Sequence, residues 1–191
     1  MFMTVDGGST EGLFIGGRTG NPGGGGRYSL FYSGVPFGMA STKPVWINGL
    51  QQNSTTRSNL ALVNTGEING AASSFRIEIF DGDSGTKAGQ TTVSVAAFRF
   101  LQLDSILATY APGTKNAYAL VTKTGGVNPF IAYGVVNDGA NPGDRSGDGA
   151  FVLSEEDDSG TWEPRKEPPP SKGTESTHGE HELGTREARP K

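Results

Sequence analysis

The placement of glycine most limits what this chain can fold into. The sequence contains 30 glycines, and all but four of them, Gly160, Gly173, Gly179 and Gly184, lie before residue 154. They have no fixed period and instead separate short apolar runs. Because glycine adopts positive φ angles at turns without steric cost, this spacing is typical of many short strands joined by tight turns.

The apolar runs between the glycines alternate as β-strands do. The run 75–80 alternates large apolar residues with Arg76 and Glu78, which predicts a half-buried strand with one wet face. The run 130–136 is apolar on both faces, which indicates a central strand. Similar runs predict further strands at 13–15, 28–32, 45–50, 59–64, 90–95 and 117–122.

One segment has helical spacing. Apolar residues from Leu103 to Tyr110 follow an i, i+3, i+4, i+7 pattern, which predicts one short helix within 101–110 with Asp104 or Ser105 as its N-cap. About eight or nine short strands and one helix predict an all-β fold. We expect an antiparallel β-sandwich or a jelly-roll-like domain.

Charge divides the chain near Leu153. Residues 1–153 hold ten acidic and ten basic residues, so the whole net charge of −4 falls on 154–191. This second part is acidic and proline-rich and has too few large apolar residues to offset the entropy of ordering. We expect a β-sandwich domain at 1–153 and a disordered tail at 154–191. The tail is either a linker to another module or a non-native stretch translated at the end of a cloned fragment.

The residue types in 1–153 exclude several chemistries. The chain has no cysteine, which excludes disulfides, thiolate zinc sites and cysteine nucleophiles. Both histidines lie in the tail, so the domain cannot use a Ser-His-Asp triad or imidazole metal ligands. A neutral domain without a basic stripe is not expected to bind nucleic acid. No run approaches the roughly 18 to 20 apolar residues that a membrane span needs.

The densest polar segment, 137–149, contains three carboxylates, those of Asp138, Asp144 and Asp148. Such a loop is a candidate Ca²⁺ site, since calcium takes oxygen ligands from flexible loops, although the spacing is not that of an EF-hand. The alternative is a long connection between strands whose aspartates cap turns and whose Arg145 neutralises them. The same three aspartates are the candidate catalytic residues, because paired carboxylates are the one enzyme chemistry that this inventory supports.

Aromatic residues suggest a binding surface. Tyr28 and Tyr32 share a strand face by parity, and Trp46 lies in the next predicted strand. A solvent-facing platform of such rings can bind sugars, because aromatic side chains bury area while keeping a polar handle. We predict Tyr28, Tyr32 and Trp46 as ligand-binding residues, with packing in the core as the alternative.

Arg57 lies where a turn rich in Asn, Ser and Thr enters the strand predicted at 59–64. Its guanidinium carries five donors in a fixed geometry that suits loop carbonyls or a carboxylate. We predict that Arg57 is a structural clasp.

The segments 49–64 and 128–138, supported by 12–19 and 31–36, resemble a repeated β-sandwich module of large secreted or surface proteins from environmental bacteria. The resemblance implies an extracellular or cell-surface location and a place inside a longer chain. The abrupt entry at 5–8 and the lack of a signal peptide at 1–4 fit a domain cut from such a chain. The resemblance implies no established activity and therefore no catalytic residues.

These observations favour an extracellular, non-catalytic module for adhesion, spacing or carbohydrate binding. Its expected partner is a carbohydrate or cell-surface polymer, and an exposed edge strand would also allow pairing with a second copy. The alternative is a small hydrolase, with a glycoside hydrolase that uses two carboxylates as the expected type.

Overall fold

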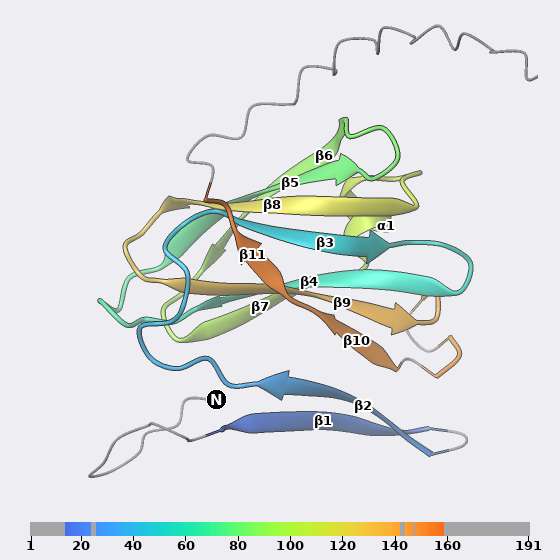
Figure 1. The fold of residues 1–191 in the computed structure, drawn as a ribbon, viewed down its shortest axis with the longest axis horizontal. Helices are drawn as coiled ribbons and strands as arrows, with labels where there is room; N and C mark the ends of the chain where they lie inside the picture. The colour runs from blue at the N-terminus through green and yellow to red at the C-terminus, as the bar shows by residue number, and fades with distance from the viewer. Residues whose placement is uncertain (1–13, 24–25, 142–143, 147, 159–191) are drawn as a thin grey trace, which may run out of the picture. The chain divides into compact units, whose positions relative to one another are not determined.

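The computed structural model describes residues 14–23, 26–141, 144–146 and 148–158. They form a β-sandwich of antiparallel strands with one short helix (Figure 1), which confirms the predicted fold class. The strands are β1 (Gly16–Gly23), β2 (Gly26–Ser33), β3 (Val45–Gln51), β4 (Thr56–Asn64), β5 (Ser73–Asp81), β6 (Lys87–Val95), β7 (Arg99–Leu103), β8 (Asn116–Gly125), β9 (Phe130–Asp138), β10 (Gly149–Val152) and β11 (Ser154–Glu156), with α1 (Ile106–Tyr110) between β7 and β8.

Two sheets face each other across the core. One has the strand order β11-β3-β8-β5-β6 and the other the order β10-β9-β4-β7. Consecutive strands often belong to different sheets, as β3 and β4 do, so the chain crosses between the layers. A separate two-stranded sheet, the hairpin β1-β2, packs Leu30 and Tyr32 on the outer face of the four-stranded sheet.

The core consists of the inward-facing side chains of both sheets. Phe75, Ile77 and Ile79 are fully buried, as their alternation predicts. The central position predicted for 130–136 is also confirmed, because β9 has a neighbour on each side and Phe130 is fully buried. Other fully buried core residues are Ile47, Leu50, Leu60, Leu62, Ile106, Leu107, Ala119 and Val121.

The prediction of a helix within 101–110 is correct for the second half of this segment and wrong for the first. The helix α1 begins at Ile106, whereas 99–103 forms strand β7 and pairs with β4. Leu101 and Leu103 point to the core from alternate positions of this strand, so strand pairing overrides the local helical spacing. Ser105 is the N-cap residue, with a φ of 47° and no side-chain capping bond.

The first strand lies later than the predicted 13–15. Strand β1 begins at Gly16 and pairs with β2 as far as Gly23 opposite Gly26. Residues 21–23 therefore belong to one strand of the hairpin and Gly26 to the other. Apolar periodicity could not reveal this strand because it has few apolar side chains.

The described domain continues past the expected end at Leu153. Strand β11 places Ser154 and Glu155 opposite Ile47 and Trp46 of β3. Main-chain hydrogen bonds hold this edge strand, and nearly every residue type can form them. The amino-acid composition of 154–156 therefore does not reveal the strand. The predicted disordered tail lies outside the described residues from 159 onward. Among the described residues, no helix is long and apolar enough to cross a membrane.

Gly89 of β6 lies against the end of α1, so a substitution at Gly89 tests how the helix packs on this strand. A Cβ atom on Gly89 would overlap the carbonyl oxygen of Tyr110 at the end of α1, whereas one on Gly70 would meet nothing within 4 Å. We expect Gly89→Ala to lower the free energy of unfolding by about 2 kcal/mol, since backbone cannot yield as a side chain can. Gly70→Ala, as the control, should change it little in urea unfolding. Equal effects would contradict this packing.

Candidate functional site

Three aromatic rings cluster on the outer face of the five-stranded sheet. Trp46 of β3 and Tyr118 of β8 have ring centroids 5.7 Å apart, and Phe80 of β5 stacks on Tyr118 at 5.3 Å. Strand parity puts them there. In β3, Val45 and Ile47 face the core, so Trp46 between them points outward. In β8, Ala117 and Ala119 face the core, so Tyr118 between them also points outward.

A surface depression of about 330 Å³ adjoins Tyr118. It lies where strands β3, β5 and β8 end or begin, so its lining comes from three segments far apart in the sequence. The lining residues are Asn48, Gly49, Leu50, Gln51, Gly82, Asp83, Asn116, Ala117 and Tyr118.

A bulge in β3 shapes one wall of the depression. The register with β8 shifts between Ile47 and Leu50, and Gly49 has a φ of +75°. Glycine adopts this left-handed conformation without strain, and a bulge turns side chains away from the regular pleat. Asn48 thereby lies exposed at the rim, although it sits in the middle of a strand.

The opposite wall is a turn organised by Asp81. Its Oδ1 accepts hydrogen bonds from the backbone N–H of Ser84 at 2.8 Å, the Ser84 hydroxyl at 2.9 Å and the backbone N–H of Asp83 at 3.1 Å. The bonds from Ser84, backbone first, hold the pKa of Asp81 below its ordinary value of 3.8. The turn is thus fixed by an ionised carboxylate, and Asp83 is held at the rim.

Four polar side chains line this depression without a hydrogen bond to the rest of the described structure. Those of Asn48, Gln51, Asp83 and Asn116 make no hydrogen bond to another described residue. Together they offer amide donors, amide acceptors and one carboxylate beside an aromatic ring. This set suits a ligand with several hydroxyl groups and an apolar face.

The three predicted ligand-binding aromatics do not form one platform. Trp46 lies in the cluster beside the depression, as described above. Tyr32 lies on the opposite side of the sandwich, where its ring contacts Tyr133 at 5.9 Å and Phe151 at 5.8 Å. The side chain of Tyr28 lies outside the described residues. Sequence reasoning did not select Tyr118, although its place between two alanines in a strand was a usable signal.

A second, smaller cleft of about 180 Å³ lies beside Tyr32. It is polar, but several of its groups are occupied by neighbours. The amide of Asn59 accepts the Ser105 N–H at 2.9 Å, and Gln102 donates to Asp104 at 2.6 Å. It is therefore a weaker candidate than the Tyr118 depression.

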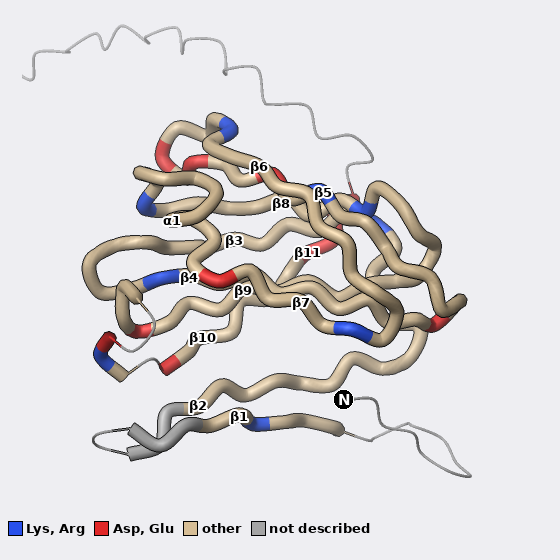
Figure 2. The backbone as a smooth tube through the Cα atoms, turned by 180° about the vertical axis from the view of Figure 1, so that it is seen from behind, with Lys and Arg blue, Asp and Glu red and all other residues tan. Residues whose placement is uncertain are grey.

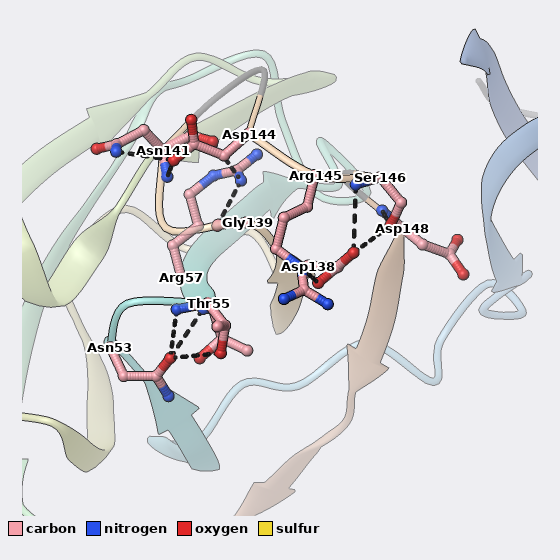
Figure 3. A network of polar contacts seen from close by, with 11 residues as sticks. Asn53, Thr55, Arg57, Asp138, Gly139, Asn141, Asp144, Arg145, Ser146 and Asp148 are labelled. Atoms are coloured by element: carbon pink, nitrogen blue, oxygen red, sulfur yellow. Dashed lines mark hydrogen bonds and ion pairs between the residues drawn. The ribbon is translucent and has the colours of Figure 1, made fainter. Parts of the chain in front are cut away.

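The acidic loop after β9 is a set of separate local contacts, as Figure 3 shows. Asp138 forms an ion pair with Arg145 at 2.6 Å and also accepts hydrogen bonds from Ser146. The other two aspartates are engaged elsewhere: Asp144 accepts two bonds from Asn141, and Asp148 accepts the backbone N–H of Ser29. Figure 2 shows the charges of this loop gathered at one end of the four-stranded sheet.

This arrangement does not gather the carboxylates predicted for calcium or catalysis. The described residues contain no group of three or more His, Cys, Asp or Glu side chains that could hold a metal ion. Hydrogen bonds from Ser146, with Arg145 contributing, hold the pKa of Asp138 below its ordinary value. A general acid of a glycosidase needs a raised pKa. Asp138, Asp144 and Asp148 make the contacts of turn and loop anchors, the alternative that the sequence left open, and their roles as calcium ligands or catalytic residues stay a prediction.

Arg57 holds the start of this loop (Figure 3). Its terminal nitrogen donates to the carbonyl oxygens of Gly139 at 2.9 Å and Asn141 at 3.1 Å, and its side chain is nearly buried. The backbone N–H of Gly139 donates to the Thr55 carbonyl at 2.6 Å. Asn53 caps the β3–β4 turn by accepting from Thr55. The predicted binding of loop carbonyls by Arg57 is confirmed.

Comparison with known proteins adds little to this picture. No family model and no curated protein matches the chain. Among solved structures, the chain is similar to the crystal structure of Thermotoga maritima 1070, with 13% sequence identity and a TM-score of 0.46. The match covers 60% of this chain and 94% of that one. At this level of similarity, the geometry of the site itself has to support any functional argument.

Removing the Arg57 side chain tests the clasp. Arg57→Ala leaves two carbonyls without their charged donor, so we expect the free energy of unfolding to fall by about 3 kcal/mol. Hydrogen exchange at the amides of 138–141 should accelerate as well. Arg76→Ala, which removes an exposed ion pair on β5, serves as the control and should cost under about 1 kcal/mol. Unchanged stability in Arg57→Ala would refute the clasp.

Asp138 gives a pH-dependent prediction. Its folded pKa is depressed, so its stabilising effect is present above the ordinary value of 3.8 and is lost as pH falls through the folded pKa. We expect Asp138→Asn to be less stable than wild type at about pH 6 and the difference to shrink toward about pH 2. Urea unfolding across this range measures it. Ser146→Ala should also reduce the difference, and a pH-independent difference would contradict the assignment.

Proposed function

We propose that this chain is an extracellular, non-catalytic β-sandwich module that binds carbohydrate. The observation that carries the proposal is the Tyr118 depression, whose lining combines amides, a carboxylate and an aromatic ring. A sugar ring has an apolar face and several hydroxyl groups. The Tyr118 ring can contact the apolar face, and the amides and the carboxylate can form hydrogen bonds with the hydroxyl groups. The volume lies at the lower end of small-molecule sites, which suits one sugar unit of a longer polymer.

The composition of the depression favours binding over hydrolysis. Cleavage of a glycosidic bond takes two carboxyl groups roughly 5 to 9.5 Å apart, one of them with a raised pKa. Asp83 is the one carboxylate among the lining residues, and nearby Asp81 is committed to its own turn. A lone carboxylate beside amides acts as a hydrogen-bond acceptor for sugar hydroxyls.

The location and partner follow from the same proposal. The segments 49–64 and 128–138 resemble modules of secreted and surface proteins, so we place the domain outside the cytoplasm. There its ligand is a carbohydrate or another hydroxyl-rich cell-surface polymer. Residues 1–153 carry no net charge and therefore produce no overall electrostatic field that would attract a charged ligand. This agrees with a neutral ligand.

Substitutions at the depression test this function. The wild type is screened on a glycan array, and the best-binding oligosaccharide is then titrated by calorimetry. We expect Tyr118→Ala to weaken binding about tenfold or more, because loss of a stacked ring removes roughly 1.4 kcal/mol. Asn48→Ala and Asp83→Ala should each weaken it as well, with little effect on stability, because both side chains are exposed.

The matched control is Tyr32→Ala, which removes a tyrosine from the opposite side of the sandwich. It should leave the affinity unchanged. Absence of binding across the array, or equal losses in Tyr32→Ala and Tyr118→Ala, would refute the assigned site.

A further inference from the structure

The two sheets end in four edge strands of unequal length. Strand β6 has nine residues, whereas β7, β10 and β11 have three to five. An edge strand presents unpaired N–H and C=O groups that another strand can use, so proteins usually keep such edges short or charged. Strand β6 is the long edge of the two sheets of the sandwich.

After Lys87 at its start, strand β6 lacks charges that would keep another strand away. From residue 88 to residue 98 the chain has no charged side chain. Within the described residues, β6 pairs with β5 alone, and the side-chain amide of Asn64 donates to the Val95 carbonyl at the end of the strand. Its outward residues, Gln90, Thr92 and Ser94, are exposed and polar.

We propose that a second copy of this chain pairs with β6 as an antiparallel strand, centred on Thr92. A two-fold axis there places Thr92 opposite its own copy and Gln90 opposite Ser94, and hydroxyl and amide pairs of this kind favour strand association. Lys87 then lies beyond the end of β6 of the second copy, which stops at Val95. The edge therefore complements itself without facing like charges.

The other edges fit a second copy less well. Strand β11 carries Glu155 and Glu156 in three residues, so self-pairing would bring carboxylates together. Strand β7 is short and begins with Arg99. Charge and length thus select β6 and select a second copy of this chain as its partner.

Pairing through β6 would join two five-stranded sheets into one continuous sheet. Cross-strand neighbours in an antiparallel pair point to the same side, so both outer faces would lie together. The two Tyr118 depressions would then open on one surface and could bind two sites on one polymer. This consequence rests on the proposed function, whereas the pairing itself does not.

Charged substitutions at Thr92 test the pairing by sedimentation equilibrium without any glycan. The wild type should have twice the mass of one chain and dissociate on dilution. Thr92→Lys and Thr92→Glu each place like charges at the axis, so we expect each to raise the dissociation constant at least about tenfold. An equimolar mixture of the two variants should restore association, because opposite charges then meet.

Thr122→Lys is the matched control. Thr122 lies on the same outer face and is also opposite Arg76, but it belongs to the interior strand β8, so its dissociation constant should stay at the wild-type value. If Thr92→Lys fails to fold, Thr92→Glu still decides, since its carboxylate lies beside Arg76. A monomeric wild type, or Thr92 variants that associate like wild type, would overturn the proposal. Loss of glycan binding without a change in the dissociation constant of the dimer would contradict the proposed function and not the pairing through β6.

Discussion

The packing of two sheets on alternating side chains is the constraint on which the rest of the structure depends. Phe75, Ile77 and Ile79 point inward and are fully buried, so every intervening residue of β5 points outward. The same parity in β3 and β8 brings Trp46 and Tyr118 to the outer face. A slip of one residue would exchange core and surface along a whole strand. The aromatic face is therefore fixed by the core, although it contributes little to it.

Alternation also explains which parts of the fold were predictable from the sequence. Strands with one apolar and one polar face, such as β5, were found because burial determines their pattern. Strand β1 is nearly free of apolar residues, and β11 is held by main-chain hydrogen bonds to β3, so neither had a pattern to detect. The segment 101–103 was included in the predicted helix because it precedes the helical spacing of 103–110, but it pairs with β4 and is a strand. Local preference fails where pairing between distant segments decides.

The candidate site was predictable only in part, and for a related reason. Trp46 was selected as an aromatic residue in a strand, and Arg57 as a donor-rich residue at a turn, since both signals are local. The depression draws on three segments, and nothing in the sequence brings Asn48, Asp83 and Asn116 together. The aspartates of 138–148 show the opposite case. Closeness in sequence suggested a shared site, but each carboxylate is satisfied by a neighbour within its own loop or by the hairpin.

Unsatisfied groups therefore carry more functional information here than clustered ones. A carboxylate that already accepts two or three hydrogen bonds would have to give them up in order to bind a ligand, and that loss opposes binding. The exposed amides of Asn48 and Asn116 make no such bonds to other described residues, and the β3 bulge positions Asn48. The same reasoning applies to the β6 edge, whose outward main-chain groups exchange water for a strand. A shallow site with one ring and one carboxylate is weak alone, so two such sites on one joined face would give it useful affinity.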